Sequence, residues 1–369
     1  MATLPEPVFF DTDEQTIIAE STAFYEGLVG KKLAPSQNET SIIQAFAYRE
    51  KMLRIAGNEA AKQMFLDFAV YPALDYLGGL LNVDRLGAAS AQCNIVFTMV
   101  SGNPALVIPA GVRIQSIDGK VVFVTLVSVA VSASSATVNV VAECTTEGVI
   151  GNGYQVGDIS VILDPQAFVD SAANSDITNG GSDAEGDVAY RERIRLAPSS
   201  FSVAGPEDAY KYFAKSANPG IIDVEITSPL PMHVNIYVLM TGGVAPSEEV
   251  LGQVEAACNP EKVRPLNDIV AALAPDAIDY ELTVELTTLT DAIDSKVLEL
   301  VNANLAAYVL ARQTKLGLDV VISQIIGKCT VDQVYDCNVI SPTVDLVIAK
   351  NQFANCTGIN VSITGQSDA

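Results

Sequence analysis

The sequence predicts a multidomain α+β protein: an N-terminal helical segment, a small all-β domain and two C-terminal α+β units. Apolar residues recur at three-to-four spacing near the N-terminus, follow a two-residue period after residue 90, and then switch repeatedly between the two periods. A length of 369 residues, at roughly 150 residues per domain, also favours several domains. We expect the two C-terminal units to be open, ferredoxin-like sheets with helices on one face.

The first 88 residues are expected to contain helices and little else. Residues 1–35, which hold three prolines, predict an extended arm with at most two short helices. Residues 36–88 predict a helical core-bundle segment that Gly57 should break and Pro72 should kink or divide. Its apolar stripes are interpreted as the core of a helix hairpin in preference to a cofactor site.

Residues 89–168 predict an all-β domain. Ile95, Phe97 and Met99 follow the period of a strand, and turn signals recur after short intervals, as in a sandwich or barrel. The uncharged run 121–141 has the length of a membrane span. Its many valines and its SASSA interruption favour two strands joined by a turn.

A polar linker, residues 169–187, is expected to separate the all-β domain from the rest of the chain. Ser182 and Glu185 have the spacing of a capping box for the helix that follows. Asp187 precedes Arg191 by four residues, which is the favourable order for an ion pair on one helix face.

The two α+β units are assigned to residues 188–277 and 278–369, since strand and helix periods alternate there. The expected strands lie near 221–228, 232–241, 269–288, 332–341, 344–349 and 357–363. The expected helices lie near 206–217, 247–258, 291–311 and 319–328.

Composition excludes several classes of function. Hydrophobic residues make up 49% of the chain and charged residues 18%, so global disorder is excluded. A net charge of −23 has the wrong sign for a sequence-independent nucleic-acid binder or for binding to an anionic membrane. Six cysteines without a CxxC spacing indicate scattered buried thiols in a reducing compartment, and the acidic N-terminus is unlike a signal peptide.

The motifs of common enzymes are absent from the sequence. P-loop, GxSxG and HExxH patterns do not occur, and the single histidine, His233, lies in an alternating strand. The acids at 183–187 begin like a calcium loop, but Val188 stands where that loop needs glycine. We therefore expect no catalytic residue, cofactor or metal. A mean hydropathy of +0.30 favours burial of surface against partners in a larger assembly.

The segment NGGSDAEGDVAYRERI, residues 179–194, resembles the signature of the baseplate J-like family of contractile phage tails and related injection systems. That family's pattern is N-G-G-x-D-x-E-S/G-D-x-x-Y/L-R-x-R-I/L. The matching residues are Asn179, Gly180, Gly181, Asp183, Glu185, Asp187, Arg191 and Arg193. Further segments at 69–85, 109–125, 148–152, 205–210, 220–224 and 264–266 agree in order, with Tyr71-Pro72 as a departure. The likeness covers about residues 40–290.

The resemblance implies a structural, non-enzymatic component of the virion, located in the tail baseplate and assembled in the host cytoplasm. In that family two copies of the J-like chain pair with one smaller wedge subunit, and six wedges surround the hub and spike. The N-terminal helices join a core bundle. The C-terminal units make dimer contacts that link wedges into a ring, whose opening releases sheath contraction. The implied partners are therefore a second copy, the smaller subunit, neighbouring wedges, the hub and sheath-proximal baseplate proteins, without nucleic acid or membrane insertion.

Two sets of residues carry hypotheses. The acids of the 179–195 motif are expected to cap the helix and to pair with Arg191, Arg193 or Arg195, which would pin the linker to the first α+β unit. Apolar helix residues are candidates for the partner interface, because such stripes need a partner to cover them. They are Ile42, Ile43, Phe46, Leu53, Phe65, Phe68 and Leu74.

Two other functions stay open at this level. A secreted or surface β-rich adhesin, with Ca²⁺ bridging its acids, would also suit the Val/Thr/Ser-rich β-domain and the acidic charge. An acidic hydrolase would need a pair of carboxylates, which sequence alone cannot distinguish from surface charge.

Overall fold

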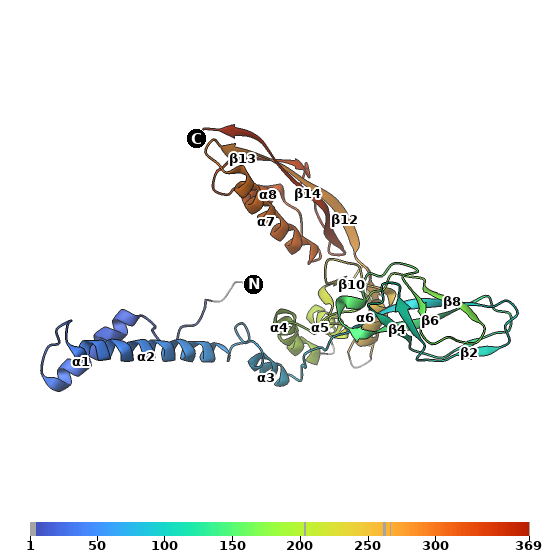
Figure 1. Cartoon of the computed structure of the whole chain (residues 1–369), viewed down its shortest axis with the longest axis horizontal. Coiled ribbons are helices and arrows are strands. Elements are labelled where there is room, and N and C mark those ends of the chain that lie inside the picture. Colours follow the sequence, from blue (N-terminus) through green and yellow to red (C-terminus); the bar gives the residue numbers. More distant parts are fainter. Residues whose placement is uncertain (1–4, 203, 261–262, 266, 369) are drawn as a thin grey trace. The chain divides into compact units, whose positions relative to one another are not determined.

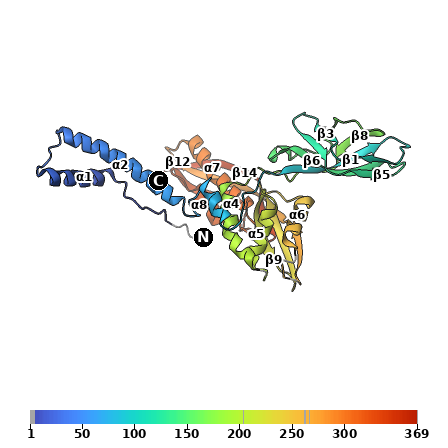
Figure 2. The same ribbon diagram turned by 90° about the horizontal axis from the view of Figure 1, so that it is seen from below.

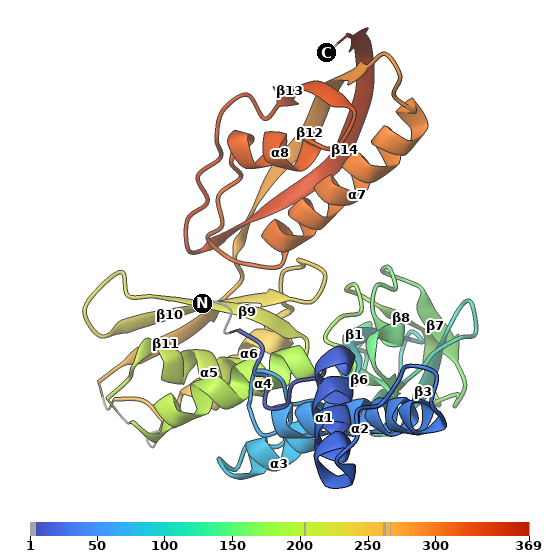
Figure 3. The ribbon, with the colours of Figure 1, turned by 90° about the vertical axis from the view of Figure 1, so that its left-hand side faces the viewer.

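A computed structural model describes residues 5–202, 204–260, 263–265 and 267–368 of the chain (Figure 1). The chain divides into two units, Met1–Asp84 and Arg85–Ala369. The first contains helices α1 to α3, and the second contains the described strands and the remaining helices. The same elements are drawn from two further directions in Figures 2 and 3.

The first unit is built on a helix hairpin. Helices α1 (Glu14–Val29) and α2 (Asn38–Lys62) lie side by side, with Ile17 of α1 buried (Figure 2). Asp13 caps α1 by accepting a hydrogen bond from the Thr16 amide at 2.8 Å. The expectation of an extended arm is therefore wrong for residues 14–29. There a capped helix packs against α2, because that contact buries an apolar side chain that an extended arm would expose.

Helix α2 continues through Gly57, where the sequence predicted a break. A side chain at this position would have its Cβ only 3.1 Å from the Phe10 ring, so the glycine makes room for the N-terminal arm. The neighbouring Asn58 holds the arm in place. Its Oδ1 accepts hydrogen bonds from the Phe9 and Phe10 amides at 3.0 and 2.9 Å, and its Nδ2 donates to the Phe10 carbonyl at 2.9 Å. Packing of the arm thus outweighs the low helix propensity of glycine.

Pro72 does divide the next apolar segment. Helix α3 (Ala73–Gly79) begins directly after it, and the preceding residues 63–71 form turns instead of the expected helix. Proline is compatible with the start of a helix, where its missing N–H would have no partner in any case.

The second unit begins with a barrel-like sheet. Its six strands have the order β7-β3-β4-β6-β1-β8, and β7 and β8 lie side by side, so the sheet is nearly closed. Phe97, Ile114, Phe123 and Ile159 fill its interior. The strands are β1 (Ser90–Met99), β3 (Arg113–Ser116), β4 (Val122–Thr125), β6 (Thr137–Glu147), β7 (Ile159–Ile162) and β8 (Val169–Asn174), with a ribbon of β2 (Leu106–Ile108) and β5 (Val129–Val131) and the 3₁₀ turn η1 (Val149–Gly151).

The uncharged run 121–141 enters three strands of this domain instead of the expected two. They are β4, β5 and the start of β6. The predicted linker also begins later than expected, because residues 169–174 form β8 and pair antiparallel with β1.

An α/β domain follows. Strand β10 (His233–Met240) pairs antiparallel with β9 (Ile221–Thr227) and parallel with β11 (Ile269–Leu273). The helices α5 (Glu207–Ala217) and α6 (Glu248–Cys258) share one apolar core with this sheet (Figure 3). Helix α4 (Asp187–Leu196) and the 3₁₀ turn η2 (Ala197–Phe201) precede them and pack against α5.

The C-terminal domain repeats this plan. Strand β12 (Asp276–Leu289) lies between β13 (Val334–Ser341), which is antiparallel to it, and β14 (Gln352–Ser367), which is parallel. Helices α7 (Asp294–Gln313) and α8 (Ile322–Cys329) join the core of this sheet.

Two expectations for these domains need correction. Each of the two sheets has three strands in the described residues, fewer than the four of a ferredoxin-like unit. The strand expected near 344–349 is reduced to one isolated bridge between Val320 and Leu346.

Candidate functional site: the barrel junction

The chain enters and leaves the barrel through two adjacent segments, residues 85–94 and 174–187, which we call the barrel junction. The segments run antiparallel. The Ala89 and Ser182 backbones exchange hydrogen bonds of 2.8 and 3.0 Å, and those of Gln92 and Asn179 exchange bonds of 2.8 and 3.2 Å. The residues expected to form a polar linker are therefore held by backbone hydrogen bonds at two levels.

Each of the two glycines in the NGG motif is required for a different steric reason. Gly180 has a φ of +88°, a backbone conformation that side chains other than glycine rarely adopt. Gly181 has no room for a side chain, because a Cβ there would lie 2.5 Å from the Gly148 carbonyl oxygen. The Asn152 side chain bonds to the same glycine. Its Nδ2 donates to the Gly181 carbonyl at 2.7 Å, and its Oδ1 accepts from the Gly181 amide at 2.9 Å.

Asn174 ties the end of β8 to the β7 side of the barrel. It is 1% exposed. Its Oδ1 accepts from the Gly157 and Ile159 amides at 3.0 and 2.9 Å, and its Nδ2 donates to the Gln155 and Asp176 carbonyls at 2.9 and 2.7 Å. Sequence reasoning missed this residue, although an Asn at the end of a strand is typical of such backbone contacts.

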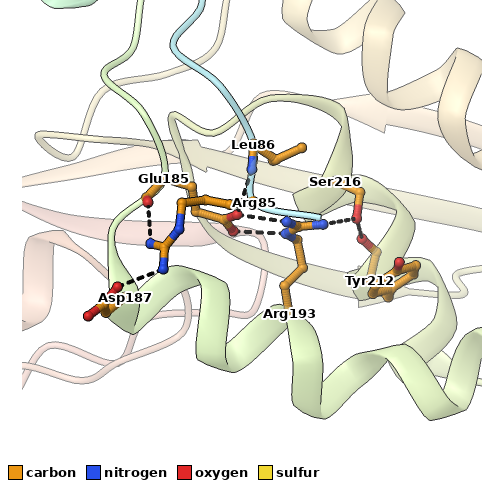
Figure 4. Close-up of polar contacts among 7 residues, drawn as sticks. All are labelled: Arg85, Leu86, Glu185, Asp187, Arg193, Tyr212 and Ser216. Atoms are coloured by element: carbon orange, nitrogen blue, oxygen red, sulfur yellow. Dashed lines mark hydrogen bonds and ion pairs between the residues drawn. The ribbon is translucent and has the colours of Figure 1, made fainter. Parts of the chain in front are cut away.

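A buried ion pair joins Glu185 and Arg193 within the junction (Figure 4). Two parallel hydrogen bonds of 2.8 and 2.7 Å join the guanidinium to the carboxylate, and the side chains are 3% and 4% exposed. Glu185 Oε2 also accepts from the Leu86 amide at 3.0 Å, and Arg193 donates to Ser216 Oγ at 3.4 Å. Additional hydrogen bonds of this kind offset the free-energy cost of removing a buried ion pair from water.

Arg85, on the segment that leads into the barrel, binds Glu185 and Asp187. Its guanidinium donates to the Glu185 carbonyl and to Asp187 Oδ1, both at 2.8 Å (Figure 4). It also lies 4.6 Å from the centroid of the Tyr190 ring, and Arg193 lies 5.6 Å from the same ring. A buried tyrosine between two guanidinium groups is a favourable cation–π arrangement. Arg85 therefore joins the entry of the barrel to the first turn of α4.

The structure corrects the expected capping box. Helix α4 begins at Asp187 with Gly186 as its N-cap, so Ser182 does not cap it. The Ser182 hydroxyl instead lies 3.3 Å from Asn218 Oδ1, and the Glu185 carboxylate binds Arg193. Of the arginines proposed as partners for the motif acids, the structure brings Arg193 to Glu185. It also pairs Asp187 with Arg85, a partner that the sequence did not suggest.

Asp183 and Asn179, the other polar members of the motif, contact nearby backbone. Asp183 Oδ1 accepts from the Val149 amide at 3.3 Å, and Asn179 Oδ1 accepts from the Gly180 amide at 2.6 Å. Both interactions stabilise local turns of the junction.

A groove of about 840 Å³ lies between the junction, β6 and α6. Acidic residues on its walls include Asp176, Glu248 and Glu249. Burial raises the pKa of Glu249, and the carboxylates of Glu143 and Asp176 raise it further. Burial and the neighbouring carboxylates therefore disfavour the charged form of Glu249.

The predicted interface residues of the N-terminal helices fall into two groups. Ile42, Phe46, Leu53 and Phe65 are exposed, at 54%, 70%, 76% and 46%, and Phe68 is half-buried. Ile43 and Leu74 are buried at 9% and 0%, so these two are wrong as partner contacts. Both belong to the chain's own core.

No group of three or more His, Cys, Asp or Glu side chains among the described residues could hold a metal ion.

No helix in the described part of the chain is long and apolar enough to cross a membrane. His233 opens β10, and its Nδ1 lies 3.2 Å from the Pro231 carbonyl oxygen.

The chain thus combines a barrel fixed to an α/β domain by buried polar contacts with helices that expose large apolar residues. Exposed apolar surface of this kind is typical of the class of proteins that bind other proteins. Comparison with known families agrees with this class. Four successive domain models of one family match the chain: the baseplate J-like N-terminal domain at 36–92, the barrel domain at 94–181, the central domain at 202–274 and the C-terminal domain at 280–362. The chain belongs to the baseplate J-like family.

One characterised relative is baseplate protein J of Escherichia phage P2, which is 35% identical over 186 residues. The match covers 50% of this chain and 61% of that protein. Among solved structures, the six-fold symmetrised baseplate of the anti-feeding prophage aligns over 91% of this chain and 89% of that chain, with 14% identity and a TM-score of 0.39.

Proposed function

We propose that this chain is a structural, non-enzymatic wedge component of the tail baseplate of a contractile phage or related injection particle. Membership of the baseplate J-like family and the likeness to baseplate protein J of phage P2 support the baseplate assignment. One observation in the structure supports a role in assembly: α2 exposes a seam of residues with the spacing of a coiled coil.

This α2 seam consists of six exposed residues spaced alternately by four and three positions. They are Ile42, Phe46, Arg49, Leu53, Ala56 and Ala60. Alternation of four and three is the heptad spacing of a coiled coil, in which each side chain inserts between side chains of the facing helix. The seam differs from the face buried in the chain itself, which contains Ile43, Ala47 and Asn58.

The chemistry of the seam indicates its partner. Phe46 and Leu53 are 70% and 76% exposed, and covering them removes much apolar surface from water. Arg49 lies between them, so the facing helix needs an acidic or polar residue at that level. A single polar position in such a seam fixes the register of the helices. The proposed occupant is the core bundle formed with a second copy and a smaller wedge subunit.

The remaining parts of the proposal follow the family. Residues 36–88 supply the bundle, 89–168 the barrel, and the units at 188–277 and 278–369 the contacts that join wedges into a ring around the hub. Opening of that ring would release sheath contraction. The buried contacts of the barrel junction support this, because a ring that switches needs rigid parts between its movable interfaces.

The test is co-expression of the chain with the other baseplate proteins of its particle, followed by native mass spectrometry. We expect a complex with two copies of this chain and one smaller subunit. The variant Phe46→Glu/Leu53→Glu should lose the smaller subunit, whereas Gln44→Glu, exposed on the same helix but outside the seam, should retain it. A monomer under all conditions, or equal behaviour of the two variants, would contradict the proposal.

A further inference from the structure

Two cysteines, Cys329 and Cys337, lie on adjoining elements of the C-terminal domain. Cys329 is the last residue of α8, and Cys337 lies in the middle of β13. Helix α8 packs against β13, as Figure 1 shows, and both cysteines belong to the same apolar core. The connection is short, because only residues 330–333 join the helix to the strand. The fold therefore brings two thiols together from a helix end and a strand.

The alternation of β13 points Cys337 toward this core. Cys337 is half-buried, whereas its neighbours Asp336 and Asn338 are exposed. Successive side chains of a strand point to opposite faces, so Cys337 lies on the face that packs against the helices. Cys329 is 0% exposed. Cys337 is thus the thiol of the two that solvent reaches, and Cys329 is enclosed by the core.

The two thiols also interact with each other. A hydrogen bond with Cys329 lowers the pKa of Cys337, while the same bond and burial raise the pKa of Cys329. A thiol with a lowered pKa carries more thiolate at neutral pH, and the thiolate is the form that attacks a disulfide. Cys337 is therefore both the more accessible and the more reactive member of the pair.

Cys93 and Cys144 in the barrel provide a comparison within the same chain. Both are buried, and burial raises the pKa of each thiol. Cys93 of β1 lies opposite Ala142 of β6, so Cys144 is displaced from it by two residues along the strand. Cα atoms in such diagonal positions are about 7–8 Å apart. Cysteines separated by more than about 7 Å cannot be bridged without backbone movement, so this pair should stay reduced.

We infer that Cys329 and Cys337 form a disulfide when the chain meets a low-molecular-weight disulfide, and that this bond fastens the end of α8 to β13. The Cys337 thiolate attacks one sulfur of the oxidant, which forms a mixed disulfide and releases one thiolate. Cys329 then loses its proton to solvent and attacks the Cys337 sulfur, which expels the second thiolate. Overall, two protein thiols are oxidised to one disulfide, and one small disulfide is reduced to two thiols.

The bond changes the stability of the C-terminal domain after synthesis. Particles that leave the host cell carry their proteins from a reducing to an oxidising solution. A disulfide stabilises a fold chiefly by restricting the unfolded chain, so the oxidised domain resists unfolding better than the reduced one. Both thiols belong to one chain, and their oxidation needs neither a second copy nor the smaller subunit of the proposed function.

Peptide mass spectrometry of the full chain is the test. The reduced chain is incubated with oxidised glutathione, alkylated with iodoacetamide in urea and cut with trypsin. Cleavage after Lys328 and Lys350 releases one peptide, residues 329–350, that contains both cysteines. We expect this peptide to be lighter by two hydrogens and to carry no alkyl group, whereas Cys93 and Cys144 should be alkylated.

Serine variants supply the control. Cys337→Ser should abolish the oxidised peptide, whereas Cys356→Ser, at a half-buried cysteine of the same sheet, should retain it. Oxidation should raise the Tm of the unaltered chain and of Cys356→Ser, but not that of Cys337→Ser. Full alkylation of the 329–350 peptide, a glutathione adduct that persists on Cys337, or a bond from Cys337 to any other cysteine would overturn the inference.

Discussion

Replacing Arg193 by methionine tests the main stabilising contact of the barrel junction. The substitution keeps a long apolar side chain but leaves the Glu185 carboxylate, 3% exposed, without its cation. Removing one partner of a buried pair costs about 3–5 kcal/mol, because the remaining charge is buried without compensation. Glu185 keeps its bond to the Leu86 amide, so we expect the lower part of this range, about 3 kcal/mol.

The assay is native-state hydrogen exchange at the Leu86 and Glu185 amides, which bond across the junction. A loss of about 3 kcal/mol accelerates their exchange roughly 150-fold. The control is Arg113→Met, since Arg113 forms the same two-bond contact with Asp164 but is 55% exposed. Surface pairs contribute little, so exchange in the control should change only slightly.

A double variant separates charge from packing. In Glu185→Gln/Arg193→Met the buried carboxylate is gone, while the Gln carbonyl can still accept from the Leu86 amide. We expect it to be more stable than Arg193→Met alone. If Arg193→Met changed exchange by no more than Arg113→Met does, or if the double variant were the least stable, the ion pair would not hold the junction as argued.

Three further predictions concern single positions. Gly181→Ala should destabilise the junction by about 1–3 kcal/mol in urea unfolding, because its Cβ has no space, whereas Gly87→Ala, with open space around its Cβ, should change little. Glu249→Gln should raise the Tm at pH 7, because it removes a carboxylate whose charged form the fold disfavours. The pKa of Glu249 is raised in the folded chain, so the native state binds a proton at this carboxyl more tightly than the unfolded state does. The increase in Tm should therefore shrink as the pH falls toward the ordinary pKa of 4.5. Asn58→Ala should speed exchange of the Phe9 and Phe10 amides while leaving the rest of α2 protected.

The strongly periodic segments were predictable from sequence. The helix expected near 247–258 is α6, and the strand expected near 232–241 is β10. These elements bury one face in a local core of sheet and helices, so the spacing of their apolar residues is enough to predict them. The sequence allowed only short helices in residues 1–35, because prolines lie on both sides and the apolar pattern is weak, whereas α1 has 16 residues. Its place is set by contact with α2.

The barrel junction was only partly predictable. The sequence pattern singles out Glu185, but the local capping rule assigns it the wrong partner. Its contacts to Leu86 and Arg193 depend on a chain segment 99 residues away and on the depth of burial. Arg85 reaches Asp187 across 102 residues, and Asn174 bonds to backbone groups 15 to 19 residues away, so no helix or strand spacing reveals these contacts.

Prediction of the partner surface from sequence is limited in the same way. An apolar stripe predicts that a helix is covered, but not by what. Ile42 and Ile43 are neighbours in the sequence, yet the first is 54% exposed and the second is 9% exposed and part of the chain's own core. Only the packing of α1 and the arm distinguishes the α2 seam from the face buried within the chain.

Photocrosslinking in the intact particle tests the central claim most directly, namely that the α2 seam is covered by another baseplate chain. A benzophenone amino acid is placed at Leu53 in the seam and, as control, at Gln44 on the same helix. We predict a crosslink from position 53 to another baseplate chain, with little product from position 44. Particles that contain the chain but give no crosslink from position 53 would contradict the account.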